Sequence, residues 1–240
     1  MKTSLLDLVI EDHDNKYGGG YGSDRRLQDW SRSSGTTEVV FRGLEEKVCE
    51  FIAAHDYIVG CVAWLTSEPI LRALAKKKGA SIIVQKEDFL RPDVGARNGW
   101  PAKLRRLYDD VPVVYRGFFP YLEDASVCGD PCCGIRCVGN HNVNKDPAFP
   151  RAHHKFIVGL SCPHDVDEPP WYGCRLTPHA VWTGSFNFTA NGTRSLENAV
   201  ILRDPVIAEA FLGEFCQVAA ISEPLDWETP WARPEWRLGS

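Results

Sequence analysis

Two histidines and a lysine stand at the start of an apolar stretch in the segment RAHHKFIVGL, residues 151–160. A cation or an imidazole is costly to bury without a partner, so this placement needs an explanation. Either the three side chains face water in the turn before a strand, or they form the anion-binding part of an active site. Taken alone, the three residues favour the first explanation, and the rest of the chain has to decide.

Two further segments offer polar side chains at the ends of expected strands. The segment WTGSFNFT, residues 182–189, carries Gly184, Ser185 and Asn187, with small polar side chains on alternate positions. A glycine there lets another backbone or a ligand approach closely. Glu197 opens the next expected strand. Together with the histidine and the lysine, these groups can bind a phosphate and supply an imidazole with a carboxylate to orient it.

The elements expected around these segments alternate between strands and helices. Apolar periodicity predicts strands over residues 38–41, 57–65, 80–85, 111–117, 154–160, 179–189 and 197–203, and helices over residues 43–55, 67–79, 101–110 and 204–220. Ser67 and Asp204 are expected to cap two of the helices, each with a proline in the first turn. The first half therefore has the strand–helix alternation of an α/β sheet.

In this order, and each on an expected strand, HHK, GSFN and the trailing EN resemble the motifs of the phospholipase D superfamily, H-x-K-x4-D followed by G-S-x-N. The resemblance covers roughly residues 38–216. It implies an α/β fold with a mixed, mostly parallel central β-sheet flanked by helices. The catalytic residues that it implies are the motif histidine and lysine, the polar pair after the glycine, and an acidic residue that supports the histidine: His153, Lys155, Ser185, Asn187 and Glu197.

The chain departs from the motif at its aspartate, where Leu160 stands and no acid replaces it nearby. Several nucleases similar to this family also lack that aspartate, so the resemblance still implies activity. The alternative is a degenerate copy that binds nucleic acid or protein without catalysis. His154 occupies the variable position of the motif and is expected to be exposed or structural.

A single H-x-K copy resembles small nucleases that pair as homodimers around one phosphate. The resemblance implies a phosphodiesterase, most simply an endonuclease on DNA or RNA, that works through a phosphohistidine and needs no metal or other cofactor for catalysis. A phospholipid phosphodiesterase is the alternative enzyme. A groove for nucleic acid has two groups of candidates, basic residues and aromatic residues for stacking: Arg91, Arg97, Lys103, Arg105, Arg106 and Arg116, with Trp100 and Tyr108. A solvated helix face explains the basic residues equally well.

Composition sets limits on these functions. The chain has 240 residues and a net charge of -5, which disfavours coating of nucleic acid by bulk charge but allows a local basic cleft. No apolar run reaches the roughly 18 residues that span a bilayer, and the acidic start does not resemble a signal peptide. A cytoplasmic protein without a membrane partner is expected.

Nine cysteines are many for a cytoplasmic chain. Clustered cysteines in a reducing compartment hold a metal more often than they form disulfides, so at least one structural zinc is expected. The candidate ligands lie in one third of the chain: Cys128, Cys132, Cys133, Cys137 and His141, with Cys162 and Cys174 as alternatives.

The domain organisation follows from the same observations. Residues 1–37, rich in Gly and Ser, are expected to form a flexible arm, and residues 38–221 the catalytic domain. Cys-rich insertions are expected at about 119–150 and 161–179. The Trp- and Pro-rich residues 222–240 are expected to form a tail that packs on the domain or docks into a larger assembly.

Overall fold

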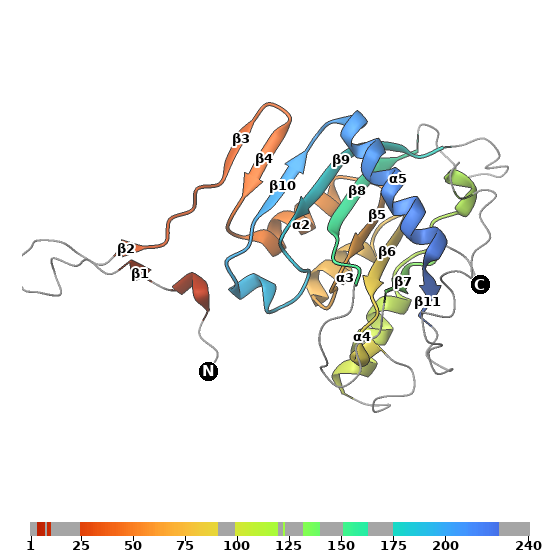
Figure 1. Cartoon of the computed structure of the whole chain (residues 1–240), viewed down its shortest axis with the longest axis horizontal. Coiled ribbons are helices and arrows are strands. Elements are labelled where there is room, and N and C mark those ends of the chain that lie inside the picture. Colours follow the sequence, from red (N-terminus) through yellow and green to blue (C-terminus); the bar gives the residue numbers. More distant parts are fainter. Residues whose placement is uncertain are drawn as a thin grey trace, which may run out of the picture.

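The computed structural model of the chain describes residues 4–7, 9–10, 25–90, 99–119, 122, 132–139, 151–162 and 175–225. A nine-stranded sheet of order β11-β7-β6-β5-β8-β9-β10-β4-β3 forms its centre (Figure 1). Its strands are β3 (Arg32–Ser34), β4 (Thr37–Val40), β5 (Tyr57–Val62), β6 (Gly79–Gln85), β7 (Ile135–Val138), β8 (Lys155–Ser161), β9 (Thr177–Gly184), β10 (Ala199–Leu202) and β11 (Glu223–Pro224). The strands β1 (Val9–Ile10) and β2 (Arg25–Arg26) form a separate antiparallel pair.

The sheet is mixed, as the sequence predicts, but the expectation that it is mostly parallel is wrong. Only β5–β6 and β6–β7 pair in parallel, and the other six pairings in the described sheet are antiparallel. A parallel pair needs a crossover connection, and helices supply it only in the first half of the chain. In the described segment between β9 and β10 there is no crossover helix, and β9 pairs antiparallel with both β8 and β10.

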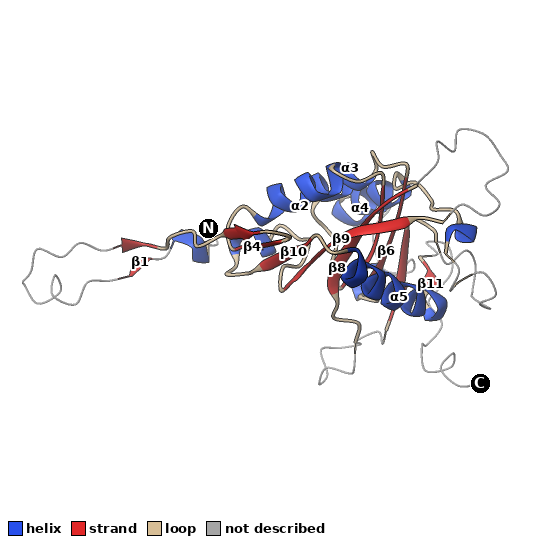
Figure 2. Cartoon of the chain, turned by 90° about the horizontal axis from the view of Figure 1, so that it is seen from above, coloured by secondary structure: helices blue, strands red, loops and turns tan. Residues whose placement is uncertain are grey.

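Helices cover both faces of the sheet (Figure 2). On one face lie α2 (Leu44–Ala53), α3 (Glu68–Leu74) and α4 (Trp100–Asp109), and on the other lies α5 (Pro205–Ile221). The two predicted caps are present: Ser67 accepts a bond from the Ile70 amide at 3.4 Å, and Asp204 accepts two amide bonds at the start of α5. Four short 3₁₀ helices complete the described elements: η1 (Leu5–Asp7), η2 (Asp88–Leu90), η3 (Arg116–Phe118) and η4 (Gly192–Arg194). No helix in the described part of the chain is both long and apolar enough to cross a membrane.

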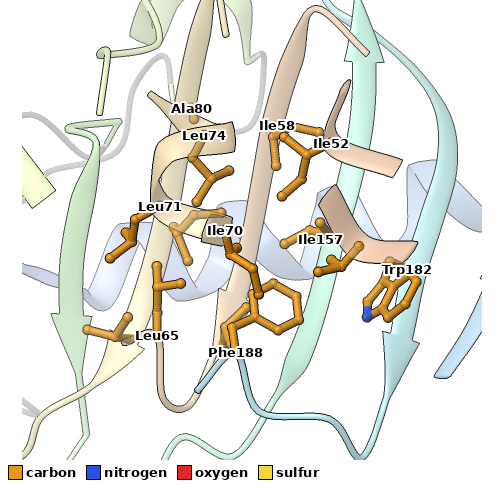
Figure 3. Close-up of a cluster of buried hydrophobic side chains, with 14 of the residues drawn as sticks. Ile52, Ile58, Leu65, Ile70, Leu71, Leu74, Ala80, Ile157, Trp182 and Phe188 are labelled. Carbon is orange, nitrogen blue, oxygen red and sulfur yellow. The ribbon is translucent and has the colours of Figure 1, made fainter. Parts of the chain in front are cut away.

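Apolar side chains fill the space on each face of the sheet. Figure 3 shows the larger cluster, in which side chains of α2 and α3 meet those of the strands beneath. Trp182 on β9 and Phe188 after it belong to this cluster and are fully buried. The other cluster packs α5, through Phe215 and its neighbours, against the opposite side chains of β5, β8 and β9. Because β5, β6 and most of β8 are covered on both faces, they are apolar without alternation.

Two expectations for the middle of the chain are wrong. Residues 111–117 do not form a strand, because β7 pairs with this edge of β6 from Ile82 onward. At the start of β6, the Ala80 amide donates to the Pro112 carbonyl oxygen at 2.8 Å. Residues 119–150 are not only an insertion, because they contain β7, which pairs in parallel with β6 from Ile82 onward. The strand β7 is only four residues long and lies in a segment rich in cysteine and glycine, so the sequence pattern did not indicate a strand there.

The main sheet extends beyond the domain limits that the sequence indicates. The β3–β4 hairpin begins at Arg32, inside the predicted arm, and β11 adds Glu223 to the edge at β7. Residues 226–240, which hold the three tryptophans of the predicted tail, lie outside the described residues.

Candidate active site

Antiparallel pairing brings the predicted catalytic residues to one end of the sheet. β8 begins there at Lys155, which pairs with Val62 at the end of β5. β9 ends there at Gly184, directly opposite Ala199 at the start of β10. The side chains that flank these strand ends therefore share one edge, together with the loops that follow β5 and β6.

Gly184 makes the junction between β9 and β10 possible. A Cβ atom at this position would lie 2.2 Å from the Asn198 carbonyl oxygen and 2.7 Å from the Ala199 Cα. No other residue allows the two backbones to come so close. The Ser185 amide then donates to the same Asn198 oxygen at 3.0 Å, which fixes the turn that follows.

His153 and Lys155 form the candidate reactive pair of the site. His153 is exposed, whereas the Lys155 side chain is buried beneath it, and its Nζ lies 3.2 Å from both ring nitrogens. Lys155 Nζ also donates to the His153 carbonyl oxygen at 2.9 Å. Desolvation, the Lys155 ammonium and the Arg151 guanidinium lower the pKa of His153 below its ordinary value. The lowered pKa favours the neutral imidazole, the form that a nucleophile or a general base needs.

Burial also lowers the pKa of Lys155, and the Glu197 carboxylate opposes that effect. Glu197 thus lies within electrostatic reach of the lysine. Its hydrogen bond, however, is with Ser185, whose hydroxyl donates to Glu197 Oε2 and accepts from the Asn198 amide at 3.0 Å. The Ser185 hydroxyl is already engaged in this arrangement, which indicates that it positions Glu197.

Asn187 lines a cleft of about 540 Å³ beside this group. Its Oδ1 is buried and has no hydrogen-bond partner among the described residues. Buried polar atoms in proteins are nearly always satisfied, so an amide left this way is available to a ligand. Its carbonyl and amino ends exchange by rotation of the side chain, so either can face that ligand. The cleft also contains Glu197 and Arg151.

Four residues of the site have no counterpart in the motifs. Gln85, at the end of β6, accepts a bond from the Ala152 amide at 2.7 Å and so holds the segment that carries His153. The Trp64 ring meets the His153 ring edge-on at 6.0 Å between centroids. Glu87 accepts a bond from Trp64 Nε1 at 3.0 Å and pairs with Arg151 at 3.6 Å. The sequence could have indicated these residues only through their position, because each lies at or just after the end of a buried strand or shortly before His153.

His154 and Leu160 lie away from the reactive pair. His154 forms an ion pair with Glu214 on α5 at 3.2 Å, which agrees with its assignment as a structural residue. Leu160 is fully buried near the far end of β8, opposite Tyr57, and belongs to the cluster beneath α5. The missing aspartate of the motif therefore removes no charge from the neighbourhood of His153.

The described cysteines do not form a metal site. Within the described residues, no group of three or more His, Cys, Asp or Glu side chains could hold a metal ion. Cys132 and Cys137 are fully buried, and the Cys137 thiol donates to Glu223 at 3.8 Å. Three of the predicted ligands, Cys128, His141 and Cys174, lie outside the described residues. The predicted zinc stays a prediction.

The predicted groove on α4 is only partly present. Tyr108 is buried and its hydroxyl donates to the Leu65 carbonyl oxygen at 2.6 Å, so the expectation that it stacks on a base is wrong. Lys103 is ion-paired with Glu68, and Arg116 donates to Leu122 O on another part of the chain. Arg91 and Arg97 lie outside the described residues. Trp100 is exposed and lines the cleft beside Asn187.

Comparison with known proteins adds three similarities. The uncharacterized protein L381 of Acanthamoeba polyphaga mimivirus is 29% identical over 205 residues, which cover 79% of this chain and 67% of that protein. Nuc from Salmonella typhimurium, a phospholipase D family member, matches with a TM-score of 0.43 and 19% identity over 76% of this chain and 92% of its own. NucT from Helicobacter pylori matches with a TM-score of 0.45 and 10% identity over 76% of this chain and 94% of its own. No model of a protein family matches the chain.

Proposed function

We propose that this chain is a phosphodiesterase of the phospholipase D type that works as an endonuclease on DNA or RNA. The observation that carries the proposal is the pairing of His153 with Lys155. The ring is exposed and its pKa is held below the ordinary value, which favours the neutral, nucleophilic form. The ammonium lies 3.2 Å from the ring nitrogens, where it can offset the charge on a phosphate oxygen.

The proposed reaction has two displacement steps at phosphorus. One ring nitrogen of His153 first bonds to phosphorus while the bond from phosphorus to the leaving oxygen breaks, and a second, protonated imidazole gives that oxygen its proton. The second imidazole then takes a proton from water. The water oxygen bonds to phosphorus, the bond from nitrogen to phosphorus breaks, and His153 is restored.

The second imidazole in this proposal is His153 of a second copy of the chain, which must take up a proton from solvent before it acts as the acid. The adjacent His154 does not fit the role, because its Nε2 is paired with Glu214. A two-fold axis through the phosphate would place a lysine and an Asn187 amide from each copy around the reacting oxygens. The nucleophile is a neutral nitrogen and the positive charge comes from lysines, so the chemistry as proposed does not require a metal ion.

The choice of nucleic acid over phospholipid rests on the lining of the cleft. Amide and hydroxyl side chains accompany the aromatic rings there, Asn187 and Asn191 among them, and an acyl chain has no use for such groups. Nucleobases offer donors and acceptors to match them.

Cleavage of labelled DNA and RNA in excess EDTA tests the proposal. We expect the wild-type chain to cut, and His153→Ala to lower the rate by about 10³-fold or more, as loss of a nucleophile does. His154→Ala is the matched control and should cut as the wild type does. Equal cutting by His153→Ala would overturn the mechanism. Turnover of phosphatidylcholine vesicles without cutting of nucleic acid would assign the lipid activity instead.

Sedimentation equilibrium under the cleavage conditions tests the proposed dimer. A monomer that cuts at the full rate would overturn the second copy as the source of the general acid.

A further inference from the structure

Three aromatic rings line the cleft, and one of them, Trp64, contacts the His153 ring. Trp64 follows β5, Phe89 lies in η2, and Trp100 opens α4. The Phe89 and Trp100 rings contact each other with centroids 5.5 Å apart. The Trp100 side chain is 50% exposed, whereas Phe89 packs partly against the larger core cluster. We call Trp64, Phe89 and Trp100 the aromatic wall.

The aromatic wall is held in place from both ends. The Trp64 indole donates to Glu87, and its ring faces the edge of the His153 ring at an interplanar angle of 85°. Phe89 is anchored by the core beneath it, and Trp100 rests on Phe89. Rigid rings lose little conformational freedom when they bind, which is why aromatic residues serve as contact points for ligands.

Polar side chains that line the same cleft suit the edge of a nucleobase. Thr66, Asn187, Thr189, Asn191 and Ser195 line the same cleft, and the Asn187 Oδ1 is buried without a partner in the described part of the chain. Amides and hydroxyls both donate and accept, as the edges of bases do. A volume of about 540 Å³ lies in the range of small-ligand pockets and is too small for a duplex.

The charges in the cleft leave little attraction for a phosphate backbone. Glu87 and Glu197 line it, and Arg151 is paired with Glu87 at 3.6 Å. The Lys155 ammonium lies beneath His153 rather than along the cleft. A strand held there must gain its affinity from something other than ion pairs, and stacking on aromatic rings supplies it.

From these observations we infer that the cleft is a subsite for an unpaired nucleobase next to the scissile phosphate, so that the chain selects single-stranded nucleic acid. This inference rests on the proposed function. In a duplex both faces of each base are stacked and its edge is paired, so a base must first be extruded to reach such a wall. A single strand presents its bases without that cost.

The test measures binding rather than cutting, in the full chain that carries His153→Ala so that the probe stays intact. Two labelled single strands of one length are compared, one with bases and one abasic. We expect Trp100→Ala to weaken binding of the strand with bases by about 10-fold, the loss typical of one stacking contact, and to leave the abasic strand unchanged. Trp30→Ala is the matched control, because Trp30 is 64% exposed and lies outside the cleft.

The variant Trp100→Phe distinguishes loss of the aromatic ring from a general effect on folding. This variant should recover most of the lost affinity, and equal thermal midpoints would show that neither variant is unfolded. The salt slope for the strand with bases should also be shallow, since few phosphates are neutralised.

The outcomes distinguish this inference from the proposed function. Equal weakening of both strands by Trp100→Ala, or no weakening of either, would overturn the base subsite even where the wild type cuts. Duplex binding as tight as single-strand binding, with the same loss on Trp100→Ala, would overturn the selection. If Trp100→Ala weakens binding of only the strand with bases, but the wild-type chain cuts no nucleic acid, the base subsite would be supported and the proposed nuclease activity would be overturned.

Discussion

Substitution of Gly184 by alanine tests how the strand ends build the site. The new Cβ would lie 2.2 Å from the Asn198 carbonyl oxygen, whereas Cβ contacts below 3.0 Å are essentially unknown. The oxygen must therefore withdraw by about 0.8 Å, and the obstacle is backbone rather than a flexible side chain. Overpacking of this kind costs about 1–3 kcal/mol in free energy of unfolding.

The same displacement reaches the catalytic residues. Asn198 directly follows Glu197, and its amide donates to the Ser185 hydroxyl at 3.0 Å. A misplacement of about 1 Å in a catalytic site costs on the order of 10²-fold in rate. Gly184→Ala should therefore lower both the thermal midpoint, by roughly 2–4 °C for each kcal/mol, and the cutting rate.

Gly213→Ala provides the matched control. Gly213 lies within α5, where a new Cβ would meet nothing within 4 Å, so alanine should raise the free energy of unfolding by about 0.5–1 kcal/mol. Calorimetry and the cleavage assay on both variants complete the experiment. An unchanged midpoint and rate for Gly184→Ala would refute the reasoning. A loss of rate in Gly213→Ala would show that any alanine for glycine disturbs the chain.

Two further predictions concern protons and metal. Because the reaction needs one neutral and one protonated imidazole, the cutting rate should pass through a maximum near the pKa of His153, and since that pKa is held below its ordinary 6.5, the maximum should lie below pH 6.5. Lys155→Met removes one of the causes, so the pKa of His153, followed by NMR titration of its ring protons, should rise; an unchanged or lower pKa would contradict the electrostatic assignment. The cysteine cluster predicts about one zinc per chain, and metal analysis of the purified protein after dialysis that finds none would remove it.

The parts of the fold that the sequence predicts well are those decided by local signals. Apolar runs located β5, β6 and β8, and the Asp204–Pro205 pair located the start of α5. β7 was missed because a strand of four residues, one of them a cysteine and one an arginine, is too short to show a hydrophobic periodicity. Its Arg136 is buried and donates to Ser222 in a distant segment, a contact that only the folded chain reveals.

The candidate catalytic residues could be proposed from the sequence because three short motifs stand in a fixed order, and the structure places them at the ends of β8, β9 and β10. The contacts of the polar residues in these motifs could not be predicted. The sequence does not tell whether a serine contacts the ligand or, as Ser185 does, a neighbouring carboxylate. The aromatic wall was predictable only at Trp100. Trp64 and Phe89 join it through the parallel pairing of β5 with β6, which brings two loops together across the sheet edge.

The structure also bears on whether Leu160 weakens the case for catalysis. β8 runs from Lys155 to Ser161, so position 160 lies five residues beyond the lysine and, at about 3.3 Å per residue, some 16 Å along the strand. Leu160 is 0% exposed and packs with the apolar residues beneath α5. A carboxylate at this position would have to be buried in that cluster, where it would need a partner to be stable. Leucine is therefore the stabilising choice in this core, and a charge at the far end of β8 cannot orient His153 or contact its phosphate. The departure from the motif is a difference in packing, and the candidate catalytic groups lie at the other end of the strand.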